Sequence, residues 1–170
     1  ARAPQKVPAT WKEAMVTFKP RDAHDEFDPG AGAFARWAAE RLVWADVAVT
    51  EDETTVARVL KDSETERGKR LCAGVTVVEI TTSGSGPTRV FVGGAVTGAA
   101  NVLRFYAIGS TGDLVQRSQG RFCGIVMGRE SYANSSGGMT HGIRVVGMFD
   151  LPENRSRTTP GGTTVKLDDL

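Results

Sequence analysis

Histidine and cysteine are scarce in this chain of 170 residues, with two of each. The two histidines, His24 and His141, lie far apart in the sequence and give little material for a metal centre or a catalytic triad. No apolar run approaches the roughly 18 residues that span a bilayer, so the sequence predicts no transmembrane helix. These absences point away from a metalloenzyme and from a protein with helical membrane spans.

A strong charge of either sign is also missing. The 21 Lys and Arg residues nearly balance the 20 Asp and Glu residues, which leaves a net charge of +1. This balance argues against a protein whose whole surface attracts nucleic acid. The hydrophobic fraction of 40% and the charged fraction of 24% are ordinary for a globular protein. The chain length fits one core with extensions.

The two cysteines, Cys72 and Cys123, leave both the redox state and the compartment open. An even number allows one disulfide, and it equally allows two buried apolar thiols. The chain starts Ala1-Arg2-Ala3-Pro4, which fits a mature form after removal of a signal peptide and equally fits a trimmed chain. A periplasmic or secreted location is therefore as compatible with the sequence as a cytoplasmic one.

The first 62 residues predict an arm followed by helices. Four prolines in residues 1–30 remove backbone donors, so we expect an extended arm with at most one short turn around Trp11 to Val16. We expect residues 31–62 to be helical. The pattern Thr50-Glu51-Asp52-Glu53 has the form of a capping box and predicts that a second helix begins there. The apolar face of the first helix is formed by Phe34, Trp37, Ala38, Arg41 and Leu42, which recur at helical spacing.

From Leu71 onward the pattern changes to β-rich segments separated by Gly, Ser, Pro and Asn clusters, which is typical of antiparallel strands. Glycines inside the segments permit the sharp coiling that a closing barrel needs. The expected fold class is mainly β with N-terminal α-helices, with a five-stranded Greek-key antiparallel barrel in residues 63–151 and a flexible tail in residues 152–170. The strands are expected at about 71–80, 88–96, 101–108, 120–129 and 142–150, with the longest connection after the third.

Five strands with the longest connection after the third match the OB barrel. The segments that carry the likeness are Arg67-Gly68-Lys69-Arg70, Val75 to Ile80, Phe91-Val92-Gly93-Gly94, Leu103-Arg104-Phe105-Tyr106 and Gly120 to Gly128. In these segments, residues 64–151 resemble the OB-fold domains of the tRNA-anticodon-binding-like family, in which a short helix ends at a Gly-Lys before the first strand. The resemblance covers about half of the chain and implies a fold rather than a ligand.

The resemblance also implies a disulfide and a binding face. The first and fourth strands of an OB barrel are neighbours, so Cys72 and Cys123 can meet. Ligands of OB barrels bind on the face of the second and third strands and in the loops after the first and fourth. Here that surface would offer Arg89, Phe91, Arg104 and Tyr106, with Tyr132, Asn134 and His141 from the fourth loop.

Arginine and aromatic side chains suit nucleic acid, because aromatic rings stack on bases and guanidinium groups match phosphates. Alternating aromatic residues in strands equally fit a protein core. Leu103 and Phe105 share one face of their strand, while Arg104 and Tyr106 share the other, which we expect to be the exposed one.

Three further patterns predict no site on their own. His24 stands among Asp22, Asp25, Glu26 and Asp28, which could hold a hard cation weakly but do not match a calcium loop. A nucleophilic pair of Cys123 with His141 would need an exposed, activated thiol. The run Gly109-Ser110-Thr111-Gly112-Asp113 lacks the Lys-Ser/Thr ending of a phosphate-binding loop and fits a capped turn better.

The sequence thus favours a non-enzymatic OB-like binding module, with no catalytic residue, cofactor or metal, that engages another macromolecule or its own copies. The alternative is single-stranded nucleic-acid binding through Arg89, Arg104 and Tyr106. A small hydrolase with an unrecognised site is a third possibility, and no residue spacing announces one.

Overall fold

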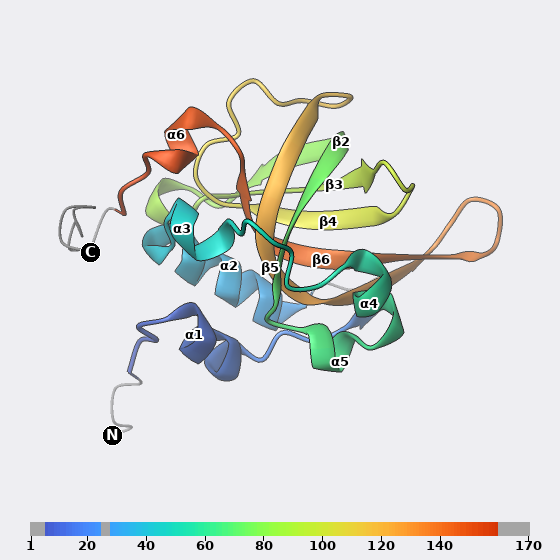
Figure 1. The fold of residues 1–170 in the computed structure, drawn as a ribbon, viewed down its shortest axis with the longest axis horizontal. Helices are drawn as coiled ribbons and strands as arrows, with labels where there is room; N and C mark the ends of the chain where they lie inside the picture. Colours follow the sequence, from blue (N-terminus) through green and yellow to red (C-terminus); the bar gives the residue numbers. More distant parts are fainter. Residues whose placement is uncertain (1–5, 25–27, 160–170) are drawn as a thin grey trace.

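A computed structural model describes residues 6–24 and 28–159 of the chain. Helices occupy its N-terminal third, and a β-sheet follows (Figure 1). The first elements are α1 (Trp11–Phe18), β1 (Ala23–His24), α2 (Pro29–Arg41), α3 (Trp44–Val47), α4 (Val56–Lys61) and α5 (Ser63–Glu66). The remaining elements are β2 (Arg70–Ser83), the 3-10 turn η1 (Gly86–Thr88), β3 (Val90–Thr97), β4 (Val102–Ala107), β5 (Gln119–Ala133), β6 (Met139–Phe149) and α6 (Pro152–Arg155).

Five strands close in a ring, so the fold is mainly β with helices, as predicted. Around the ring β2 pairs with β3, β3 with β4, β4 with β6, β6 with β5, and β5 with β2. The sheet is mixed rather than antiparallel throughout, because β4 and β6 run parallel. The chain reverses direction once between β4 and β5 and again between β5 and β6, so β6 returns in the direction of β4.

The five predicted strands are all present, but the first and the last two are longer than expected. The predicted connection over residues 130–141 is mostly a hairpin, in which Tyr132 pairs with Thr140 and Ala133 with Met139. Only residues 134–138 form its turn, where Asn, Ser and Gly provide the turn chemistry. The longest connection within the ring, residues 108–118, lies between the third and fourth strands of the ring, as predicted.

The inside of the ring is filled by aromatic and aliphatic side chains. Phe105, Phe122 and Phe149 are fully buried there, with ring centroids 5.1–5.8 Å apart. Edge-to-face contacts of this kind add to the free energy of apolar burial. The inner core therefore draws on β4, β5 and β6, together with residues of β2 and β3.

The ring closes tightly at a pair of glycines and at a disulfide. Gly124 and Gly147 face each other in β5 and β6, and a Cβ on Gly147 would lie 1.9 Å from the carbonyl oxygen of Cys123. On the other side of β5, Cys123 faces Cys72 of β2, and the two form a disulfide. The predicted disulfide is confirmed, and the alternative of two free buried thiols is not.

The N-terminal helices cover the outer surface of the ring. Phe34 and Ala38 of α2 pack in one cluster with Tyr106 of β4, Ile125 of β5 and Met148 of β6. The Asp28 carboxylate caps α2 by accepting hydrogen bonds from the amides of Gly30 and Ala31. Figure 1 shows α2 lying along the ring.

Two predictions for the N-terminal third need correction. In the arm predicted over residues 1–30, the short turn expected around Trp11 to Val16 is a full helix, α1, whose N-cap Thr10 accepts a hydrogen bond from the Glu13 amide. The first predicted helix ends at Arg41, which is exposed rather than part of the apolar face. Residues 1–5 and 25–27 of the predicted arm lie outside the described residues.

The predicted capping box at Thr50 starts no helix. The Glu53 carboxylate instead accepts hydrogen bonds from the amide and the Nε of Arg70, at 2.9 and 3.0 Å. Helix α4 begins later, at Val56, with Thr55 as its N-cap. A salt bridge to the start of β2 thus replaces the local hydrogen bonds that the motif predicted.

The predicted flexible tail, residues 152–170, begins with helix α6, and residues 160–170 of it lie outside the described residues. Asn154 of α6 is buried and donates hydrogen bonds to the carbonyl oxygens of Ser110 and Phe149. Among the described residues, no helix has the length and hydropathy needed to cross a membrane.

Candidate functional site

The predicted binding face on β4 is largely covered. Arg104 and Tyr106 do point to the same, outer side of the ring, as predicted. Tyr106 is only 7% exposed, because it packs in the cluster under α2. Burial raises the pKa of its hydroxyl above the ordinary value. Of this pair, only Arg104 reaches the surface.

Arg104 is engaged by two carboxylates. Its guanidinium group lies 3.2 Å from Glu79 of β2 and 3.5 Å from Glu130 of β5, and 35% of its side chain is exposed. Glu130 is buried and also lies 3.2 Å from Arg144 of β6. Because these carboxylates already neutralise Arg104, its charge is poorly available to a phosphate group.

Two of the remaining predicted residues lie together, on the other side of β3. Arg89 is exposed, and its guanidinium carbon lies 4.7 Å from the centroid of the Phe91 ring. Phe91 packs against the inner core, whereas Val92 beside it packs under α2. Arg89 and Phe91 therefore form no common surface with Arg104 and Tyr106.

The last group of predicted residues belongs to a projecting hairpin. We call residues 131–141, the outer ends of β5 and β6 with their turn, the ribbon. Tyr132 is half-buried, and its ring centroid lies 5.8 Å from the guanidinium carbon of Arg104. Burial raises the pKa of the Tyr132 hydroxyl. Asn134 ties the turn together by accepting hydrogen bonds from the amides of Ser136 and Gly138.

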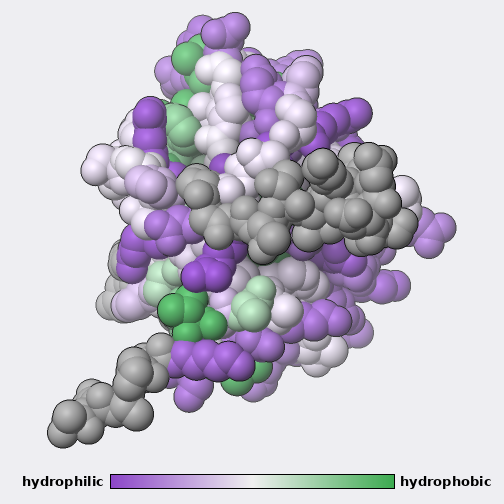
Figure 2. Space-filling model, turned by 90° about the vertical axis from the view of Figure 1, so that its left-hand side faces the viewer, coloured by the Kyte–Doolittle hydropathy of each residue, from purple (hydrophilic) through white to green (hydrophobic). Residues whose placement is uncertain are grey.

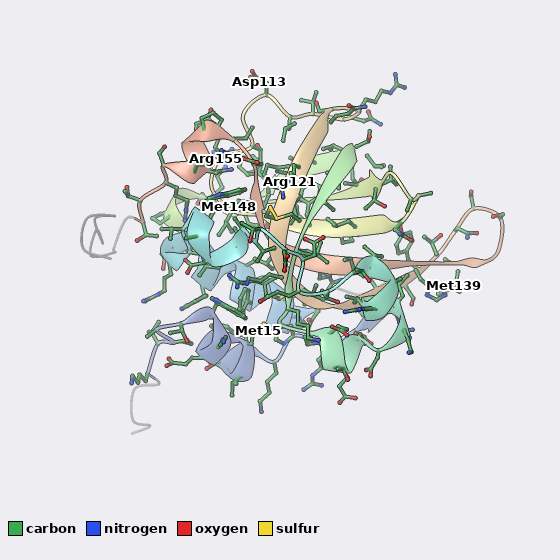
Figure 3. All side chains as sticks on the ribbon, in the orientation of Figure 1. Met15, Asp113, Arg121, Met139, Met148 and Arg155 are labelled. Atoms are coloured by element: carbon green, nitrogen blue, oxygen red, sulfur yellow. A yellow bond between two sulfur atoms is a disulfide. The ribbon has the colours of Figure 1, made fainter. Side chains whose placement is uncertain are left out.

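Most of the ribbon is exposed, and it carries no Lys, Arg, Asp or Glu. Its turn and the β6 arm stand in solvent, with Met139 51% exposed. Figure 3 places Met139 in this part of the molecule, away from the helices that cover the ring. Figure 2 shows the opposite side of the molecule, where hydrophilic residues are interspersed with pale and hydrophobic ones. The ribbon is therefore an exposed surface without charge.

One edge of the ribbon lacks a partner strand. The pairing of β4 with β6 begins at Gly142, so no described strand pairs with Met139, Thr140 or His141 on the side away from β5. Such an edge presents backbone N–H and C=O groups that can pair with another chain. The geometry suits strand addition at this edge.

Cys123 and His141 do not form a nucleophilic pair. Cys123 is in the disulfide and cannot act as a nucleophile with His141. His141 is exposed, and its Nδ1 lies 3.0 Å from the hydroxyl oxygen of Ser131. Ser131 is only 2% exposed and sits directly opposite His141 in the hairpin, as an ordinary cross-strand pair.

The acidic cluster around His24 is occupied by structural roles where the structure describes it. Asp22 accepts hydrogen bonds from the Ser63 hydroxyl, the Arg67 guanidinium group and the Arg129 amide. Asp28 caps α2, and the predicted residues Asp25 and Glu26 lie outside the described residues. Partial burial raises the pKa of Asp22, but these hydrogen bonds and the Arg67 charge outweigh that effect and lower it.

The predicted turn at residues 109–113 contains hydrogen bonds of the expected kind. The Gly112 amide donates to the Ser110 hydroxyl, and the Ser110 amide donates to the side chain of Asn154. The loop is thus a capped turn held by α6.

Sequence reasoning missed the three charged residues that organise the outer face, Glu79, Glu130 and Arg144. Arg144 stands between Ile143 and Val145 in an apolar strand, and only this interruption of the apolar pattern could have marked it. Its pairing with Glu130 depends on the register of β5 and β6, which the sequence alone does not specify.

No family model, curated protein or solved structure matches the chain.

Proposed function

We propose that this chain is a non-enzymatic OB-like binding module that engages protein through the ribbon, and that a second copy of the chain is the partner. The observation that carries the proposal is the unpaired, uncharged edge of β6 at Met139–His141. No catalytic role is assigned to any residue.

The strand arrangement supports the OB-like part of the proposal. The ring has five strands, its first and fourth strands are neighbours joined by the disulfide, and its longest connection follows the third strand. These features agree with a five-stranded Greek-key barrel. The fifth strand of the ring, β6, pairs in parallel with the third, β4, and this pairing closes the ring.

The covered outer face favours protein over nucleic acid as the partner. Binding of single strands needs stacking rings and free cations along a groove. Here α2 covers Tyr106, and Glu79 and Glu130 engage Arg104. The ribbon, in contrast, has the low charge that is typical of the centre of protein interfaces.

The exposed edge of β6 favours a second copy of the chain as the partner. Monomeric proteins usually protect exposed edges with Lys, Pro or a covering element, and the ribbon has no charge that would repel an approaching strand. An identical edge in a second copy offers matching donors and acceptors about a two-fold axis. The net charge of +1 adds little repulsion between copies.

Sedimentation equilibrium over a range of protein concentrations tests this proposal. We expect the weight-average mass to rise from monomer to dimer, and Met139→Lys to shift the midpoint at least tenfold higher in concentration. Val16→Lys is the matched control, because Val16 is 73% exposed on α1, outside the ribbon, and we expect no shift from it. A monomer at every concentration up to about 1 mM (a free energy of about −4 kcal/mol), or equal effects of both variants, would overturn the proposal.

Fluorescence anisotropy with labelled single-stranded DNA and RNA tests the nucleic-acid alternative. Saturable binding that weakens steeply with salt and is lost in Arg104→Ala would favour that alternative over the ribbon. Absence of binding at about 50 mM salt agrees with the covered face.

A further inference from the structure

Beyond this function, α2 leaves a gap where it crosses the sheet. A cavity of about 390 Å³ lies between α2, the ends of β2 and β3, and Tyr106. On α2 it is bounded by Gly32, Ala35 and Arg36, which share one face of the helix at spacings of three and four residues. Gly32 and Ala35 place little side chain on this face of α2, and Val90 and Val92 of β3 form another wall of the cavity.

The walls of this cavity combine apolar surface with a polar rim. Val90, Val92 and the Tyr106 ring form the apolar part, and hydroxyl side chains of the β2–β3 connection form the rim. The size falls in the range of roughly 300–1,000 Å³ that is usual for small-molecule sites. A ligand with an apolar body therefore fits the interior.

Of the residues that the structure describes, Arg36 is the only charged one that lines the cavity. It is exposed, and no salt bridge joins it to a carboxylate of the described residues. Elsewhere on the same face, Arg104 and Arg144 are both held by Glu130. Arg36 is thus a cation that remains available at the mouth of an apolar cavity.

Tyr106 supplies a second indication of a ligand. Its side chain is more than nine-tenths buried, and it lines the cavity. Its hydroxyl makes no hydrogen bond to any described residue. Because the hydroxyl oxygen itself remains accessible, it can hydrogen-bond to a polar atom of a ligand or a water molecule in the cavity.

We propose that this cavity binds a small amphiphile, with its apolar body between α2 and β3 and its single anionic head group on Arg36. A medium-chain carboxylate has this chemistry.

Octanoate, 1-octanol and acetate are probes that separate the two parts of the proposal. Octanoate has both body and head, octanol lacks the charge, and acetate lacks the body. Titration into the ¹⁵N-labelled protein, followed by amide chemical shifts, reports where each probe binds. We expect octanoate to shift the amides of Gly32, Ala35, Val92 and Tyr106, octanol to bind several-fold more weakly, and acetate to leave them unchanged.

Two pairs of variants tie the binding to the cavity. Arg36→Gln should weaken octanoate binding about three- to five-fold, the strength of an exposed ion pair. Arg41→Gln, which changes another exposed arginine of the same helix, should have no effect. Val92→Phe should abolish binding by filling the cavity. Val96→Phe changes the same outer side of β3, outside the cavity lining, and should not.

The spectra also show whether each variant is folded, so a loss of binding is interpreted only for a folded protein. Shifts confined to other surfaces, or no saturable shift with octanoate at millimolar concentration, would overturn the proposal. Equal affinity for octanol and octanoate would remove the role of Arg36.

Discussion

Strands β5 and β6 form one continuous hairpin whose two halves have opposite surroundings. Within the ring, residues 122–128 and 142–149 are all buried, by the inner core on one side and α2 on the other. Beyond it, the same two strands form the ribbon, whose turn and β6 arm are exposed. Strand pairing alone therefore does not decide whether a segment of a hairpin stabilises the core or contacts other molecules. The ring half is suited to stability and the ribbon half to contact with other molecules.

The largest expected difference between the halves concerns glycine. A methyl group at Gly147 would meet the Cys123 carbonyl oxygen at 1.9 Å and the Gly124 Cα at 2.5 Å, and both are backbone atoms of the paired strand. We expect Gly147→Ala to lower the free energy of unfolding by about 3 kcal/mol or more. Gly138→Ala, whose nearest contact is the Asn134 side chain at 3.5 Å, should change it by less than about 0.5 kcal/mol. Urea unfolding measures both, and equal losses would remove the distinction.

The disulfide should give the next largest effect, since it fixes the ring half of β5 to β2. It joins residues 51 apart in the sequence, and a closed loop of this length is expected to stabilise the fold by about 4 kcal/mol through the unfolded state. Cys72→Ala with Cys123→Ala should therefore lower the urea midpoint strongly. Added reductant should lower the midpoint of the natural chain and leave that of the double variant unchanged. A double variant as stable as the natural chain would contradict this.

Glu130 lies at the boundary between the two halves, as the last residue of β5 before the ribbon. Its carboxylate is buried between Arg104 and Arg144. Glu130→Gln leaves these cations poorly compensated and should cost about 3 kcal/mol. Glu79 also pairs with Arg104, but 62% of its side chain is exposed, so Glu79→Gln should cost less than about 1 kcal/mol. Thermal or urea unfolding measures both losses of stability, and equal losses in the two variants would contradict this prediction.

The smallest expected effect concerns pH at the same boundary, where Asp22 accepts a hydrogen bond from the Arg129 amide. The pKa of Asp22 is lower in the folded protein than its usual value. The ionised Asp22 carboxylate therefore stabilises the folded protein above its pKa in the unfolded chain, about 4. This stabilisation is lost as the pH falls through its pKa in the folded protein. Asp22→Asn should cost about 1 kcal/mol at pH 7, with a smaller deficit near pH 3.

The control for this prediction is Asp113→Asn, which changes an exposed carboxylate in the connection after β4. Urea unfolding at several pH values should show no comparable pH dependence for it. An Asp22→Asn deficit that stayed constant down to pH 3 would contradict the role of the ionised carboxylate.

The strands of the ring could be predicted from local pattern to a large extent. Alternating apolar residues and Gly-rich connections marked all five strands, and the resemblance to OB-fold domains, in which the first and fourth strands are neighbours, placed Cys72 beside Cys123. The lengths of β5 and β6 were missed, because polar residues such as Asn134 and Thr140 lie within or beside a hairpin whose regularity comes from pairing. Glu53 was misassigned for a related reason, since its partner Arg70 is remote in the sequence.

The candidate site could be predicted only in part. The alternation of Leu103 and Phe105 with Arg104 and Tyr106 correctly separated the two faces of β4. Local pattern carries no information on what covers a face, so the burial of Tyr106 by α2 was not foreseen. The pairing of Arg104 with Glu79 and Glu130 likewise depends on the register of three strands, which tertiary packing specifies.

The position of β6 in the ring has a consequence for how the molecule is made. It is the last strand of the ring in the sequence, yet it fills the gap between β4 and β5. As the chain leaves the ribosome from its N-terminus, β2 to β5 must wait as an open sheet with two unsatisfied edges until residues 139–149 emerge. Cys72 and Cys123 are both available during that interval, so oxidation can fasten β2 to β5 before the last strand docks.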